Sequence, residues 1–124
     1  MEQLLLHLIG DYVIQTDWMA RNKTGNIFIA AIHAGVYSLP FLLLSPSMRA
    51  LVVIFGTHVI MDRYRLARYV VFAKNKVTDP GLKWEDACKT GYHKDTPPWL
   101  AVWLLIIVDN TMHLTINYSA LHWL

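Results

Sequence analysis

Long apolar stretches alternate with short polar connections along the 124-residue chain. A helix needs about 20 mostly apolar residues to cross a bilayer, and four segments approach or exceed that length: about 3–20, 27–44, 48–73 and 97–121. The pattern therefore predicts an all-α fold, in which residues 1–124 form a single four-helix polytopic membrane bundle. The third segment is too long for one span, so we expect its second half to emerge as an amphipathic, arginine-bearing extension.

Turn residues mark the ends of these segments. Ser47 follows a Ser-Pro pair and is a plausible N-cap for the third helix. Pro98 stands where the fourth helix begins, and proline suits the first turn of a helix. Between the third and fourth segments, residues 74–98 are polar and rich in turn formers, which predicts one long cytoplasmic loop.

Composition favours a membrane protein over a soluble one. Hydrophobic residues make up 55% and charged residues 16% of the chain, against about 45–50% and about 25% in ordinary soluble domains. A water-soluble bundle with a polar core is the alternative, but segment 27–44 has no polar stripe wide enough to face water. The formal charge of +2 and the lack of a basic, aromatic-interleaved face exclude nucleic acid as a partner.

The distribution of positive charge predicts the orientation of the bundle. Arg49 is the only one of the 11 Lys and Arg residues that lies in the second connection; all the others lie in or near the first and third. Because positive charge accumulates in cytoplasmic loops, we expect the first and third connections to be cytoplasmic and both termini to lie outside.

Histidine and aspartate recur in these apolar segments with a constant spacing. His58 and Asp62 are four residues apart, which places them on one face of a helix. The same spacing occurs near the start of the chain and, reversed, near its end, and the remaining segment carries one histidine. All these side chains can meet within roughly two helical turns of the membrane midplane. The predicted ligand pool is His7, Asp11, His33, His58, Asp62, Asp109 and His113.

Inserting an aspartate into a membrane is energetically unfavourable, so three buried aspartates indicate that this cluster has a function. One Asp at the centre of a membrane helix costs about 2.5–3.5 kcal/mol, so three would cost on the order of 10 kcal/mol. Protons, hydrogen-bonded partners or a metal must neutralise them. Mixed imidazole and carboxylate ligands suit Zn²⁺, with Mn²⁺ or Fe²⁺ as alternatives, and the charge allows one or two ions. The simpler alternative is that His–Asp pairs only hold the helices together.

Further residues are candidates for catalysis, substrate binding and assembly. An aspartate that binds no metal is a candidate general base, and the candidates are Asp11, Asp62 and Asp109. Gln15 and Asn117 extend the His/Asp faces, and Arg63 and Arg65 follow Asp62, so these four are predicted to bind substrate. Interhelical hydrogen bonds and a positive-inside anchor are the competing explanations. The small residues Ala30, Ala31, Ala34 and Gly35 form a close-packing face that predicts a homo-oligomer or an internal helix contact.

Several of these motifs resemble a known family. They are His7-Leu-Ile-Gly-Asp11 with Gln15, His33 with Tyr37, and the HxxxD and DxxxH helices. The chain resembles a family of small phage and bacterial integral-membrane proteins known as a domain of unknown function. That resemblance implies a phage or bacterial origin and a location in the bacterial inner membrane, with no assigned reaction. More loosely, the His- and Asp-bearing helices look like those of inner-membrane metal-dependent hydrolases.

These observations lead to three functional hypotheses. The first is an integral-membrane, metal-dependent hydrolase acting on a lipid or lipid-linked phosphate, with membrane lipid as its partner. The second is a proton or metal-ion transport module, because intramembrane Asp and His chains also mark such pathways. The third is a non-enzymatic phage membrane protein that modifies a host membrane component and uses its polar pairs for assembly.

Overall fold

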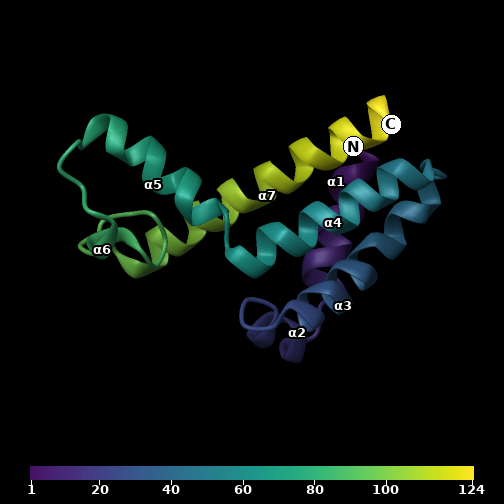
Figure 1. The fold of residues 1–124 in the computed structure, drawn as a ribbon, viewed down its shortest axis with the longest axis horizontal. Coiled ribbons are helices and arrows are strands. Elements are labelled where there is room, and N and C mark those ends of the chain that lie inside the picture. The colour runs from purple at the N-terminus through teal and green to yellow at the C-terminus, as the bar shows by residue number, and fades with distance from the viewer. The chain divides into compact units, whose positions relative to one another are not determined.

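The computed structural model describes residues 1–124 and contains helices but no strands, which confirms the all-α prediction. The chain forms two compact units. The first comprises Met1–Tyr64 together with His113–Leu124, and the second comprises Arg65–Met112. Figure 1 shows the helices in chain order. All the predicted metal ligands except Asp109 lie in the first unit.

The first apolar segment is broken rather than continuous. It contains α1 (Glu2–Leu8), the π-helix η1 (Ile9–Val13) and α2 (Asp17–Asn22). Thr16 leaves the helical conformation, with φ −79° and ψ 158°, and its side-chain oxygen accepts a hydrogen bond from the backbone N–H of Met19. Such N-caps satisfy the otherwise unpaired amides at a helix start. The expectation of one uninterrupted helix over about 3–20 is therefore wrong.

The second apolar segment forms α3 (Ile27–Ser38), which continues as the 3₁₀ helix η2 (Leu39–Leu44). Asn26 caps α3 by accepting a hydrogen bond from the Phe28 amide at 2.8 Å. Pro40 lies in the first turn of η2, where its missing N–H costs least. Ser45 then adopts a left-handed conformation, with φ 48°, and ends the segment. Predicted and observed boundaries agree here.

The third segment divides into two helices, α4 (Met48–Tyr64) and α5 (Ala67–Thr78). The predicted cap is confirmed, because Ser47 Oγ accepts a hydrogen bond from the Ala50 amide at 3.1 Å. Arg65 has φ 52° and ends α4, since a side-chain-bearing residue rarely continues a right-handed helix from that conformation. The second half of this segment, which was predicted to emerge as an amphipathic extension, is therefore a separate helix that begins after Arg65.

Within the first unit, α3 and α4 lie side by side (Figure 1). Ala30 and Ala34 are completely buried and pack with Val59 of α4. The small side chains let the two backbones approach closely, so this predicted packing face is used inside the chain. Its use in a homo-oligomer stays a prediction.

The last helix, α7 (Pro98–Trp123), starts at the expected proline. Its 26 residues correspond to a length of about 39 Å, and large apolar side chains such as Trp99, Trp103 and Ile107 are exposed. The segments Ile27–Leu44 and Pro98–Trp123 are long and apolar enough to cross a membrane. No other segment meets that criterion, so the four-span bundle is not confirmed.

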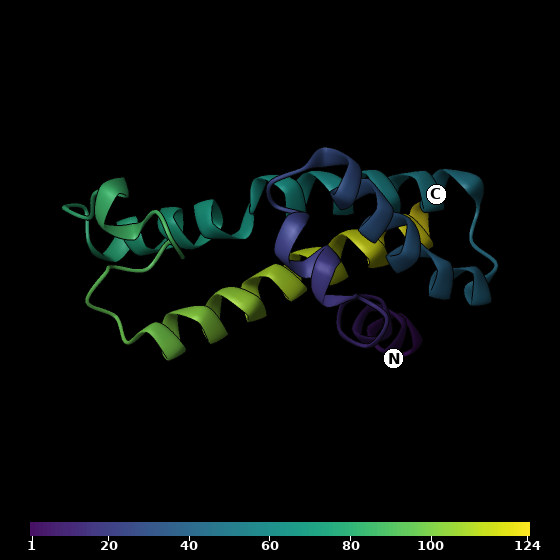
Figure 2. The same ribbon diagram turned by 90° about the horizontal axis from the view of Figure 1, so that it is seen from below.

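The chain ends and the turn before α4 lie at the same end of the first unit. Ser47 Oγ donates a hydrogen bond to the backbone carbonyl of Leu124 at 2.9 Å, which joins the end of α7 to the start of α4. Figure 2 shows the C-terminus near the start of α4. A cavity of about 530 Å³ at this end is lined by residues of the N-terminus, the turn and α7, among them Met1, Ser45 and His122.

The second unit contains more helix than the predicted loop over 74–98 allowed. Residues up to Thr78 continue α5, and α6 spans Trp84–Ala87. Trp84 of α6 stacks on Tyr69 of α5 with ring centroids 4.8 Å apart, and it meets Phe72 edge-on at 5.1 Å. Aromatic packing therefore orders a segment whose composition suggested only a loop.

Candidate metal centre

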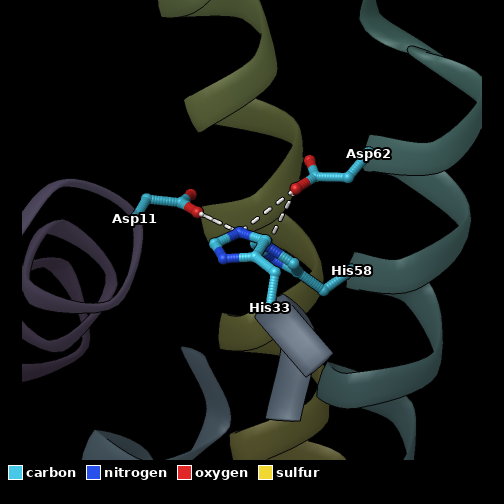
Figure 3. Close-up of side chains that lie close together, drawn as sticks. All are labelled: Asp11, His33, His58 and Asp62. Atoms are coloured by element: carbon cyan, nitrogen blue, oxygen red, sulfur yellow. Dashed lines mark hydrogen bonds and ion pairs between the residues drawn. The ribbon is translucent and has the colours of Figure 1, made fainter. Parts of the chain in front are cut away.

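Four buried side chains from three elements of the first unit converge on one point (Figure 3). Asp11 comes from η1, His33 from α3, and His58 and Asp62 from successive turns of α4. Nε2 of His33 lies 3.1 Å from Asp11 Oδ1 and 3.2 Å from Asp62 Oδ2. Nε2 of His58 lies 3.4 Å and 3.2 Å from the same two oxygens. The two Nε2 atoms are 3.0 Å apart.

These separations match the edges of a tetrahedron around a small divalent ion. Zn²⁺ binds nitrogen and oxygen ligands at about 2.0–2.2 Å, so neighbouring ligand atoms in a tetrahedral site are about 3.3–3.6 Å apart. The five measured edges are 3.0–3.4 Å, slightly shorter than that. All four ligand atoms lie within 4.8 Å of one another. The cluster can therefore hold a metal ion with little rearrangement.

Hydrogen bonds alone account poorly for this arrangement. An imidazole Nε2 carries at most one hydrogen, yet Nε2 of His33 lies within 3.2 Å of Asp11, Asp62, His58 and a lysine ammonium. The Nδ1 atoms of His33 and His58 are buried and have no hydrogen-bond partner. All hydrogen-bond and ion-pair contacts of these two rings are thus made by their Nε2 atoms, which lie at the common centre.

Local backbone structure brings Asp11 into the cluster. Asp11 lies in the π-helix, where the Ile14 amide donates to the Ile9 carbonyl at 3.0 Å. Single π-helical turns within α-helices occur frequently at functional sites. Gly10 permits the close approach of η1 to α3, because a Cβ at this position would lie 2.5 Å from Cδ2 of Tyr37 and 3.1 Å from its carbonyl oxygen. The glycine and aspartate of the first motif therefore act together.

A second layer of buried polar side chains surrounds Tyr37, which is completely buried. Its ring stacks on that of His58, with centroids 3.7 Å apart. Asn117 Nδ2 donates to the Tyr37 hydroxyl oxygen at 2.6 Å, which leaves the hydroxyl hydrogen to be donated to Nδ1 of His7 at 2.8 Å. Tyr37 thereby fixes the His58 ring and links α1 to α7.

Two of the predicted ligands lie beside the four converging residues. Nδ1 of His7 is 3.6 Å from Asp11 Oδ2, and its closer contact is Tyr37. Nε2 of His113 is 3.4 Å from Asp62 Oδ1, the oxygen on the other side of that carboxylate from the imidazole contacts. Both histidines are buried. His7 can orient the carboxylate of Asp11, and His113 can orient that of Asp62.

The remaining predicted residues have other surroundings. Asp109 is half-buried and lies one turn before His113 on α7, in the part that belongs to the second unit. Arg63 Nη1 donates to the Thr24 carbonyl at 2.6 Å, and Arg65 Nη2 donates to the Lys89 carbonyl at 3.0 Å. The amide of Asn117 binds Tyr37, and Gln15 is half-buried. Arg63, Arg65, Asn117 and Gln15 do not join the converging set Asp11, His33, His58 and Asp62, and the catalytic or substrate roles of all five residues stay predictions.

Lys23 is the member of the site that the sequence analysis missed. Its Nζ lies 2.6 Å from Asp62 Oδ2 and 3.2 Å from His33 Nε2, and its side chain is only 17% exposed. In the sequence it counted only as a positive charge in the first connection. A lysine next to a turn can bury its aliphatic stem and reach inward, but nothing in the local pattern indicates which group it reaches.

The fold and the cluster together define an all-helical protein with a buried His/Asp site that can hold a metal ion. Residues 1–122 match the profile of the family described as protein of unknown function (DUF3307), and the chain belongs to that family. No curated protein and no solved structure matches the chain significantly.

Proposed function

We propose that the protein is an integral-membrane, metal-dependent hydrolase that acts on a lipid or lipid-linked phosphate. The observation that carries the proposal is the convergence of Asp11, His33, His58 and Asp62 at tetrahedral separations within a buried site. Zn²⁺ is the ion that this ligand chemistry and size suit best, with Mn²⁺ or Fe²⁺ as alternatives.

Three of the four side chains suffice to hold an ion in a catalytic site, which keeps one position open. Asp11, His33 and His58 come from three different elements and would form that set. A bound ion would acidify a water molecule and polarise a substrate oxygen. Asp62 would then be the general base, because its carboxylate stands at the fourth corner of the cluster.

A membrane location fits both the exposed apolar surface and the arrangement of the chain ends. Two segments have the length and hydropathy to cross a bilayer. We place the protein in the bacterial inner membrane, with the first and third connections in the cytoplasm and both termini outside. The shared location of Met1, Ser47 and Leu124 at one end of the first unit supports the part of this topology in which both termini and the second connection lie on the same side.

Proton or metal-ion transport is the second candidate, and a continuous line of buried polar groups favours it. The line runs from Asp11 to His7 at 3.6 Å, from His7 to Tyr37 at 2.8 Å and from Tyr37 to Asn117 at 2.6 Å. Chains of this kind occur in pumps and transporters. Transport would appear as ion flux into protein-containing liposomes without release of phosphate.

The test combines metal analysis with an activity assay on protein purified in mild detergent. Metal content is measured by elemental analysis, and phosphate release is measured from mixed micelles of phosphorylated lipids. Asp11→Asn removes a ligand charge, whereas His122→Ala is the matched control, because His122 is exposed and lies outside the cluster. We expect stoichiometric metal and hydrolysis in the wild type and the control, and loss of both in Asp11→Asn. Bound metal without hydrolysis of any lipid phosphate would refute the enzyme and favour transport.

A further inference from the structure

The ammonium group of Lys23 lies where it would repel a cation bound in the cluster. It is the C-cap residue of α2, and its Nζ contacts Asp62 Oδ2 at 2.6 Å and His33 Nε2 at 3.2 Å. These two atoms are corners of the tetrahedron described above. An ion within about 2.0–2.2 Å of His33 Nε2, at the centre of that tetrahedron, would lie close to the ammonium group, and burial limits the screening between the two like charges.

We propose that Lys23 is a tethered competitor of the metal ion. In the metal-free protein its ammonium group neutralises Asp62, and it leaves that carboxylate when an ion binds. Lys23 therefore determines how tightly the site holds a divalent cation. This inference rests on the metal site of the proposed function and adds a residue that controls its loading.

The surrounding contacts indicate which part of Lys23 moves. Its backbone amide donates to the Met19 carbonyl at 2.9 Å, and the Asn26 amide donates to the Asn22 carbonyl at 3.0 Å. Arg63 holds the Thr24 carbonyl at 2.6 Å. The backbone on both sides of Lys23 is thus anchored, whereas the side chain has a flexible four-carbon stem. When an ion binds, the Lys23 side chain therefore rotates away from Asp62 towards the exposed surface of the turn after α2, while its backbone stays in place.

The first test compares metal affinities of Lys23→Met and wild type by chelator competition with Zn²⁺ at one fixed pH. Methionine keeps most of the apolar stem and removes the charge. We expect the variant to bind Zn²⁺ at least about tenfold more tightly, which corresponds to about 1.4 kcal/mol. Arg21→Met is the matched control, because Arg21 is exposed and pairs only with Asp17 at 2.9 Å. Unchanged or weaker binding in Lys23→Met would overturn the competitor role.

The second test uses the wild-type protein and does not depend on a variant that folds. An amine-reactive acylating reagent is applied with and without Zn²⁺, and labelling is read by mass spectrometry. We expect Zn²⁺ to increase labelling of Lys23 severalfold while labelling of the exposed Lys83 stays constant. Bound Zn²⁺ with constant Lys23 labelling would refute the competitor and leave the proposed function intact. Absence of Zn²⁺ binding in both wild type and Lys23→Met would refute both.

Discussion

Replacing His33 with alanine is the most direct perturbation of the candidate metal centre. Nε2 of His33 forms three of the five measured edges of the tetrahedron, at 3.1 Å to Asp11, 3.2 Å to Asp62 and 3.0 Å to His58. The side chain is completely buried. The variant therefore removes one ligand and keeps Asp11, His58 and Asp62 on their own elements.

The size of the effect follows from the number of ligands. Zinc binding to a structural protein site with four ligands is worth about 10–16 kcal/mol, and in the proposed site water fills the fourth position. An equal share per ligand is about 2.5–4 kcal/mol, and every 1.4 kcal/mol is a tenfold change in affinity. We therefore expect His33→Ala to weaken Zn²⁺ binding by roughly 60- to 700-fold.

Chelator competition on detergent-purified protein measures this change, with His122→Ala as the control for loss of a histidine outside the cluster. Thermal unfolding of the metal-free variants checks that the fold persists. If His33→Ala binds Zn²⁺ within threefold of wild type, or no more weakly than the control, the tetrahedral interpretation of the cluster is wrong.

Further predictions concern the packing around the site and the membrane topology. Tyr37→Phe deprives the buried amide of Asn117 of its acceptor, so we expect a loss of about 1–3 kcal/mol in the free energy of unfolding. Metal affinity should persist because the ring still stacks on His58; a tenfold loss would contradict this. Gly10→Ala overpacks the contact with Tyr37 and should cost about 1–3 kcal/mol, whereas an unchanged melting temperature would disprove the close approach. Reporter fusions at Lys83 and Leu124 should report cytoplasmic and external locations, respectively; a cytoplasmic signal at Leu124 would reverse the orientation. The protein should stay in the membrane fraction after a carbonate wash, and its release would exclude an integral-membrane location.

Local patterns in the sequence were enough to predict some features of the protein. The apolar run over 27–44, the cap at Ser47 and the start of α7 at Pro98 depend on near neighbours only, and all three are confirmed. The spacing of His58 and Asp62 likewise predicted that both side chains share one face, because helical periodicity alone determines that relation. Each of these statements concerns a single segment and its ends.

Only the tertiary structure decided which of these faces meet. His33 and Asp11 join His58 and Asp62 because η1, α3 and α4 pack together, and Gly10 and the π-helical turn set how closely η1 approaches. The same packing brings in Lys23, which is 39 residues away from Asp62 in the sequence. Helical periodicity determines only which face of a helix a side chain occupies. Which faces meet depends on how the helices pack and where they are interrupted, and no local sequence pattern indicates that.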